Sequence, residues 1–214
     1  MKHQSPATLT ALLFLSLLLV TESPRYLQDK STSTLQQQIA TQVLRFHIRA
    51  NSDTVADQQK KLRIKQSLLE WLTPILSENT SKSETIQCIR KNLPDIRKEA
   101  TRMAAQDEVY RQGYDYPVKA EITNMFFDTR EYETVTLPAG CYDALRITIG
   151  EAEGHNWWCV LYPSLCFADA LEPSMTEEGE EKLQQVLDED AYDLLLHPQK
   201  LKIRFRLEFF LRNR

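Results

Sequence analysis

The residues best suited to chemistry in this 214-residue sequence are a histidine and two cysteines, His47, Cys159 and Cys166. A nucleophilic thiolate needs a base within hydrogen-bond reach and a third group that orients the base. His47 could serve either cysteine as the base, with Asn51 or Asp53 as the orienting group. Such a site would make the protein a cysteine-dependent hydrolase of peptides or cell wall. The alternation of residues 43–50, however, places His47 among arginines on the polar face of a strand, which argues against this interpretation.

Motifs for other common chemistries are missing from the sequence. Its five glycines never come closer than four positions apart, so neither a dinucleotide-binding GxGxxG motif nor a P-loop can be written. The sequence contains no HExxH and no GxSxG, and no histidine lies at zinc-ligand spacing from a cysteine pair. We therefore expect no cofactor and no metal site.

The N-terminus has the layout of a secretory signal. Its first three residues include Lys2, and they are followed by an apolar run over residues 9–20 and by a polar stretch that reaches Pro24. Twelve residues at 1.5 Å rise span only about 18 Å, short of the roughly 30 Å hydrocarbon core of a bilayer. Because the residues before a cut match the usual pattern poorly, a cleaved signal and a retained N-terminal anchor both stay open. In either case we expect the working domain outside the cytoplasm, near a membrane.

Export changes the interpretation of the four cysteines, Cys88, Cys141, Cys159 and Cys166. Disulfides persist outside the cytoplasm, and four cysteines allow three connectivities that a sequence cannot separate. Cys159 and Cys166 are the nearest pair and flank a turn at Pro163, so they are the first candidates. A disulfide or buried thiols are favoured over catalysis.

Hydrophobic periodicity predicts an α+β fold. Residues 43–50 alternate as a half-buried strand with Leu44, Phe46 and Ile48 toward the core. A long helix follows it, and two more helices are expected on either side of Pro94. The long helix carries four basic residues that we interpret as a solvated helix face: Lys60, Lys61, Arg63 and Lys65.

Beyond Pro117 the period falls to two, which predicts strands over residues 118–126, 131–137, 144–150, 157–162 and 200–209. The third and fourth of these are expected to form a hairpin. We predict a mostly antiparallel sheet packed by about three to four helices and preceded by an N-terminal signal or anchor segment. The expected organisation is a signal or anchor at 1–23, a polar spacer at 24–34, a core domain at 35–168, and an acidic helical segment with a basic C-terminal strand at 169–214.

Charge is balanced overall and segregated locally. A formal net charge of −4 does not supply the positive field that nucleic acids require, so no nucleic-acid partner is expected. Residues 169–193 hold ten acids and one base, whereas residues 198–214 hold six bases and one acid. Two oppositely charged surface elements close to each other are the favoured interpretation. The alternative is a basic strand that contacts a membrane or an acidic partner.

Trp157 and Trp158 are adjacent, and adjacent residues in a strand face opposite sides. One indole can therefore enter the core while the other stays outside, where an exposed tryptophan is a strong anchor for a protein partner. Core packing of both is equally compatible with the sequence. We predict that Trp157 or Trp158, together with Asn51, Asp53 and Asn156, forms partner contacts or is critical for the structure.

Two segments resemble a known family. Residues 44–53, LRFHIRANSD, resemble the IRLHVIANSD segment of the stage II sporulation protein R family. Residues 156–167, NWWCVLYPSLCF, are similar to that family's NWWCVLFPPLCF or NWWCVLYPPLCF block, with Ser164 in place of its second proline. Order and separation also match, and the resemblance covers about residues 35–167.

The resemblance implies a signalling protein rather than an enzyme. Members of the family are made in the forespore of endospore-forming Firmicutes and exported into the space between the forespore and mother-cell membranes. There they trigger a membrane-embedded aspartic protease of the mother cell, which cleaves the sigma-E precursor. The resemblance supplies no catalytic residues, and none is assigned.

Overall fold

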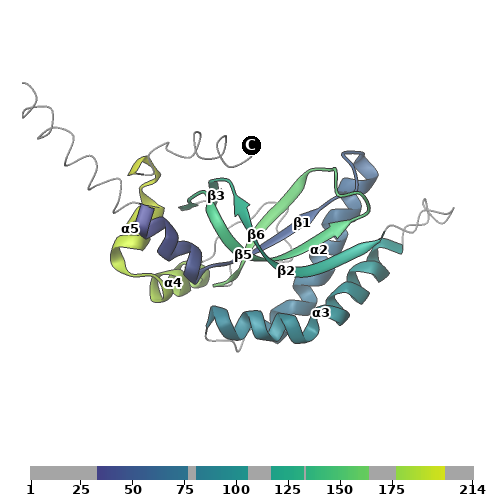
Figure 1. Cartoon of the computed structure of the whole chain (residues 1–214), viewed down its shortest axis with the longest axis horizontal. Helices are drawn as coiled ribbons and strands as arrows, with labels where there is room; N and C mark the ends of the chain where they lie inside the picture. Colours follow the sequence, from purple (N-terminus) through teal and green to yellow (C-terminus); the bar gives the residue numbers. More distant parts are fainter. Residues whose placement is uncertain (1–32, 77–80, 106–116, 133, 164–176, 201–214) are drawn as a thin grey trace, which may run out of the picture.

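A four-stranded sheet forms the centre of the molecule, which is a computed structural model that describes residues 33–76, 81–105, 117–132, 134–163 and 177–200 (Figure 1). Its strands are β1 (Leu44–Arg49), β2 (Val118–Phe127), β5 (Gly140–Ile149) and β6 (Asn156–Tyr162), in the order β2-β5-β1-β6. The β1 strand runs parallel to β5, while the β1–β6 and β2–β5 pairs are antiparallel. The predicted α+β class with a mostly antiparallel sheet is therefore confirmed.

The predicted hairpin of residues 144–150 and 157–162 is wrong, because β1 lies between these two segments. All of β1 except Arg49 is buried. A strand buried on both faces belongs inside a sheet, where neighbours on its two edges satisfy its backbone donors and acceptors. The chain between β5 and β6 consequently crosses over the end of β1 instead of closing a tight turn.

Two long helices cover the first face of the sheet, α2 (Val55–Leu76) and α3 (Lys82–Ala105) (Figure 1). The backbone N–H of Asp57 donates to the Thr54 hydroxyl at 3.3 Å, which caps the start of α2. Leu44, Phe46 and Ile48 are fully buried in the hydrophobic core between this face and the helices, as predicted.

Two predictions about these helices are wrong. The chain is one continuous helix through Pro94, whose exposed ring leaves the packed side of α3 intact. Lys60, Lys61 and Lys65 are buried, and only Arg63 of the basic group is exposed. Long apolar stems can pack along the protein, and the amines of Lys61 and Lys65 have polar or aromatic partners. The Lys61 amine donates to the Gln58 side chain at 2.6 Å, and the Lys65 amine lies 5.4 Å from the centre of a tryptophan ring.

The described elements that cover the second face of the sheet lie at one end of it (Figure 1). The covering elements are a helix of residues 33–42, strands β3 (Arg130–Tyr132) and β4 (Val135–Leu137), helices α4 (Glu177–Val186) and α5 (Glu189–Leu196), and the 3-10 helix η2 (Pro198–Lys200). They enclose a second hydrophobic core that includes Phe127, Tyr142 and Leu183. Residues 131–137 are thus two short antiparallel strands with a reversal between them, and the single predicted strand is wrong.

The predicted leader, most of the spacer, the basic tail from residue 201 and Cys166 lie outside the described residues. None of the helices in the described ranges is long and apolar enough to cross a bilayer.

Candidate functional site

The two motif blocks form neighbouring strands. In the antiparallel β1–β6 pair, His47 lies opposite Trp158 and Arg49 lies opposite Asn156 (Figure 1). The same pairing places Phe46 opposite Cys159. Residues more than 100 positions apart in the chain therefore meet on one part of the sheet, next to the turn that follows β1.

Asn51 joins the turn after β1 to the loop between β5 and β6. Its side-chain oxygen accepts from the Glu151 backbone N–H at 3.0 Å, and its backbone carbonyl accepts from the Glu153 N–H at 3.0 Å. The Asn51 amide nitrogen donates to the buried carboxylate of Asp57 at 2.8 Å, in the first turn of α2. One side chain thus connects three segments of the chain.

Asp53 makes the second connection to the same loop. Its carboxylate accepts from the backbone N–H of His155 at 2.5 Å and also contacts the His155 ring nitrogen Nδ1. The backbone N–H of His155 lowers the pKa of the Asp53 carboxyl. Since Asp53 is bonded to His155, it is not the orienting group of His47 that the sequence suggested.

Gly154 sits at the closest approach between this loop and the turn. A Cβ atom on residue 154 would lie 2.2 Å from the backbone oxygen of Ser52, a separation that real contacts do not allow. The backbone N–H of Gly154 also donates to the Ala50 carbonyl at 3.0 Å, so the loop cannot simply move away. Sequence analysis did not single out this residue, although it lies between the two motif blocks.

We expect Gly154→Ala to lower the free energy of unfolding by about 1–3 kcal/mol, because the added methyl group must displace backbone atoms. Gly140→Ala is the matched control, since its Cβ would meet only the Tyr142 ring, at 3.4 Å. Urea unfolding followed by circular dichroism measures both variants. Equal losses of unfolding free energy in the two variants would show that the contact with the Ser52 backbone does not exclude a side chain at residue 154.

His47 lies in a buried cluster of flat side chains. Its ring is stacked on Trp158, with centroids 4.1 Å apart and an interplanar angle of 9°. Its Nε2 is hydrogen-bonded to the side-chain oxygen of Asn156 at 2.9 Å. Burial lowers the pKa of His47 to about 4, with nearby Arg146 and Arg49 acting in the same direction. The ring is therefore neutral at pH 7.

His47 shares a sheet face with the arginines of β1, as its position in the alternation indicates, but that face is not solvated at this point. The His47 side chain is only 1% exposed. Cys159 is fully buried in the core on the opposite face. His47 and Cys159 thus point to different sides of the sheet, and the nucleophile–base pair that the sequence permitted is not formed between them. Cys88 and Cys141 carry free thiols.

Trp157 and Trp158 face opposite sides of β6. Trp157 is 7% exposed and packs edge-to-face on Phe46, with ring centroids 5.7 Å apart. Trp158 is half-buried, and the guanidinium carbon of Arg130 lies 5.4 Å from the centre of its ring. Whether either tryptophan contacts a partner stays a prediction, as it does for Asn51, Asp53 and Asn156.

Arg45 is a second residue in this region that was not singled out from the sequence. It is fully buried, and its Nη2 donates to the Tyr132 hydroxyl at 2.8 Å. Its guanidinium carbon lies 4.6 Å from the centre of the Phe127 ring and 5.2 Å from that of Tyr142. Among the described residues no carboxylate pairs with it. The sequence did carry a clue: Arg45 and His47 are two positions apart in β1, so both side chains lie on the second face of the sheet.

Comparison with known proteins places these strands in a family. Residues 40–172 match the family model described as stage II sporulation protein R. This chain belongs to the stage II sporulation protein R family. It is also 35% identical over 144 residues to the stage II sporulation protein R of Bacillus subtilis strain 168. That alignment covers 67% of this chain and 62% of the relative, so the chain matches less than two thirds of that protein's length.

The family region extends from just before β1 to beyond β6, so it contains both motif blocks and the turn and loop that join them. Helices α4 and α5, which cover the second face, begin after the region ends. No solved structure matches this chain. The sequence resemblance to stage II sporulation protein R is therefore confirmed.

Proposed function

We propose that this member of the stage II sporulation protein R family is an exported signal that activates a membrane-embedded aspartic protease of the mother cell. The protease in turn cleaves the sigma-E precursor. The protein is made in the forespore and secreted into the space between the two membranes, where its N-terminal segment is either removed or kept as an anchor. The observation that carries this proposal is the family match over residues 40–172, which includes both motif blocks of the sheet.

The chain acts by binding rather than by catalysis. His47 is neutral, buried and on the opposite sheet face from Cys159, so this pair offers no activated thiolate. A ligand shifts a conformational equilibrium only through its difference in affinity for the two states. The chain must therefore bind the active state of the protease more tightly than the inactive state.

We also propose a disulfide between Cys159 and Cys166. The free thiols of Cys88 and Cys141 leave Cys166 as the remaining cysteine for Cys159. A bond across residues 160–165 would close the end of β6 in the oxidising space where the protein works. Peptide mapping without reduction should recover residues 159 and 166 in one linked peptide. Recovery of both as alkylated free thiols from exported protein would contradict the bond.

Deletion of the gene from its endospore-forming host tests the function. We expect the sigma-E precursor to accumulate uncleaved on immunoblots through sporulation, and we expect the wild-type gene to restore cleavage. Normal processing in the deletion strain would contradict the proposal.

A reconstitution separates activation from catalysis. The protease, the sigma-E precursor and an exported form of this chain are produced together in a host that does not sporulate. We expect cleavage only when all three are present, and none when the catalytic aspartate of the protease is replaced by alanine. Cleavage that persists with the inactive protease would make this chain itself the peptidase.

A further inference from the structure

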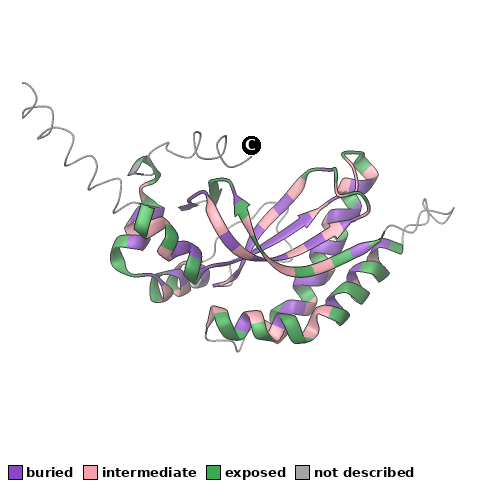
Figure 2. Cartoon of the chain, viewed as in Figure 1, coloured by how far each residue is buried: buried purple, intermediate pink, exposed green. Residues whose placement is uncertain are grey.

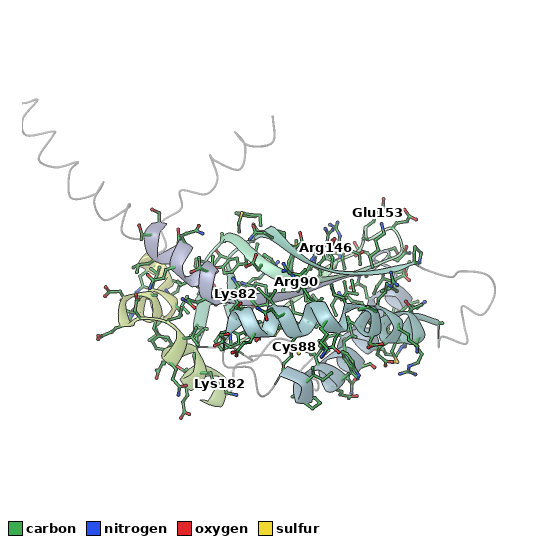
Figure 3. All side chains as sticks on the ribbon, turned by 60° about the horizontal axis from the view of Figure 1, so that its bottom comes forward. Lys82, Cys88, Arg90, Arg146, Glu153 and Lys182 are labelled. Atoms are coloured by element: carbon green, nitrogen blue, oxygen red, sulfur yellow. The ribbon has the colours of Figure 1, made fainter. Side chains whose placement is uncertain are left out.

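The end of the second sheet face that no described element covers carries a group of basic and aromatic side chains. We call it the basic face, and it consists of Arg49, Arg130, Arg146, Asn156 and Trp158 around the buried His47. The register explains the grouping, because His47 lies beside Arg146 of β5 on one edge and opposite Trp158 of β6 on the other. All of these residues except His47 are half-buried or exposed, and buried and intermediate residues alternate along β5 and β6 (Figure 2). Arg146 lies on the side of the sheet away from α3 (Figure 3).

The positive charge of this face is not neutralised within the described residues. The one ion pair found there joins Arg146 Nη1 to Glu121 Oε1 at 3.7 Å, beyond hydrogen-bond distance, with the two side chains 33% and 55% exposed. Arg49 has no ion pair with any described residue. Exposed pairs of this kind contribute little to stability. The guanidinium groups are therefore available to an external anion.

Hydrogen-bond donors on this face also lack acceptors. The Nε atoms of Arg49 and Arg146 are buried without a hydrogen-bond partner among the described residues. Unpartnered buried donors are costly and therefore rare in native proteins. These two arginines lie on the neighbouring strands β1 and β5, so this face holds two buried donors that the described part of the chain does not satisfy.

Trp158 provides an apolar platform beside the arginines. Its indole is held between the His47 ring and Phe127, whose centroid is 4.8 Å away. A rigid, half-exposed tryptophan next to arginines is the composition typical of binding hot spots. Guanidinium groups bind carboxylates in a planar, two-bond geometry.

We propose that the basic face docks an acidic segment of a partner protein, with carboxylates on Arg49 and Arg146 and an apolar side chain on Trp158. A peptide fits better than an anionic membrane, because exposed acids lie next to the face and would repel a uniformly negative plane. Glu121 lies opposite Arg146, and Glu151 and Glu153 belong to the loop that is hydrogen-bonded to Asn51. Only the partner's identity, the extracytoplasmic part of the membrane protease, rests on the proposed function.

The reconstituted cleavage reaction tests the docking face with full-length chains. The double variant Arg49→Gln/Arg146→Gln removes both charges without adding carboxylates, and we expect it to lower the rate of precursor cleavage at least tenfold. Trp158→Ala should lower the rate to a similar extent. The matched control is Lys91→Gln/Lys98→Gln, which removes two exposed charges from α3 and should stay within twofold of the wild type.

The outcomes separate this proposal from the proposed function. If the wild type gives no cleavage, the activating role fails. If the wild type and the arginine double variant activate equally, the role stands and the docking face is wrong. A gain of activity in the double variant would show that the chain's own acidic segment occupies the face, which also overturns the proposal.

Direct binding gives a readout that does not depend on the protease. Hexaglutamate should change the tryptophan fluorescence of the full chain, and the arginine double variant should bind it at least tenfold more weakly. Thermal unfolding within a few degrees of the wild type would show that the variant is folded. If the double variant loses affinity for phosphatidylglycerol vesicles and keeps its affinity for hexaglutamate, the face contacts lipid and the proposal fails.

Discussion

Replacing Arg45 by alanine should lower the free energy of unfolding by about 3–5 kcal/mol, as large-to-small substitutions of the biggest core side chains do. Arg45 is among the largest fully buried side chains of the described residues, and it fills the space between the rings of Phe127, Tyr132 and Tyr142. Alanine would leave a cavity lined by these rings. It would also leave the Tyr132 hydroxyl without the donor that it contacts at 2.8 Å.

Arg45→Met is the informative companion of the alanine variant. Burial lowers the pKa of Arg45, which means that the protein destabilises its charge. Nε and Nη1 have no hydrogen-bond partner, so one hydrogen bond and the ring faces are the only compensation found among the described residues. Methionine fills similar space without a charge that must be desolvated. We expect it to recover more than half of the stability that alanine loses.

Urea unfolding at pH 7 distinguishes these contributions. A small loss for methionine and a large loss for alanine would mean that Arg45 stabilises the fold by its volume. If both variants lose the same 3–5 kcal/mol, the guanidinium group is itself the stabilising element, through its contacts with the rings. In that case our account of an undercompensated charge would be wrong.

The sequence predicted the fold class and one face of β1, and it missed what covers the other face. The alternation of Leu44, Phe46 and Ile48 is a local pattern, and it placed these residues in the core correctly. The same alternation grouped Arg45, His47 and Arg49, and polar side chains normally mark a solvated face. Whether that face is buried depends on the helix of residues 33–42 and also on α4, α5 and the β3–β4 hairpin. The last three lie about 80 or more residues away in the chain.

The order of the strands in the sheet could not be predicted from local sequence patterns, for a related reason. A short loop between two strands usually indicates a hairpin, and the segment between β5 and β6 satisfies that rule. The loop instead crosses the end of β1 because Asn51 and Asp53 supply it with hydrogen-bond acceptors. The motif residues could be picked out from the sequence, but their connecting role required the positions of segments 100 residues apart.

The buried lysines show a similar limit. A basic cluster on an amphipathic helix is usually solvated, and charge alone cannot reveal that the stems are covered. Lys61 is buried because its amine reaches the carbonyl of His155 at 3.1 Å, in the same loop that crosses β1. That contact depends on the strand order, so the error about Lys61 follows from the error about the hairpin.

Acidification from pH 6.5 to pH 4 should remove about 3 kcal/mol of stability through His47 alone. Its pKa is about 4 in the folded protein and about 6.5 in the unfolded chain. Between these values the unfolded state binds more protons, so stability rises with pH. The contribution of His47 is fully present above pH 6.5 and is lost as the pH falls toward 4. The slope in this window should approach 1.4 kcal/mol per pH unit, the limit for one proton.

His47→Gln isolates this contribution, because glutamine cannot be protonated in this range and can still hydrogen-bond to Asn156. Hydrogen bonds from Arg102 and Ser67 lower the pKa of the Glu99 carboxyl to about 2. Glu99 therefore affects stability mainly below pH 4.5, outside the range in which His47 titrates. Urea unfolding of both proteins at intervals between pH 4.5 and 7 gives the two slopes. The glutamine variant should be much less pH-dependent than the wild type, although less stable at pH 7. Parallel slopes would show that folding does not lower the pKa of His47, and that neither burial nor the nearby Arg146 and Arg49 keeps its ring neutral.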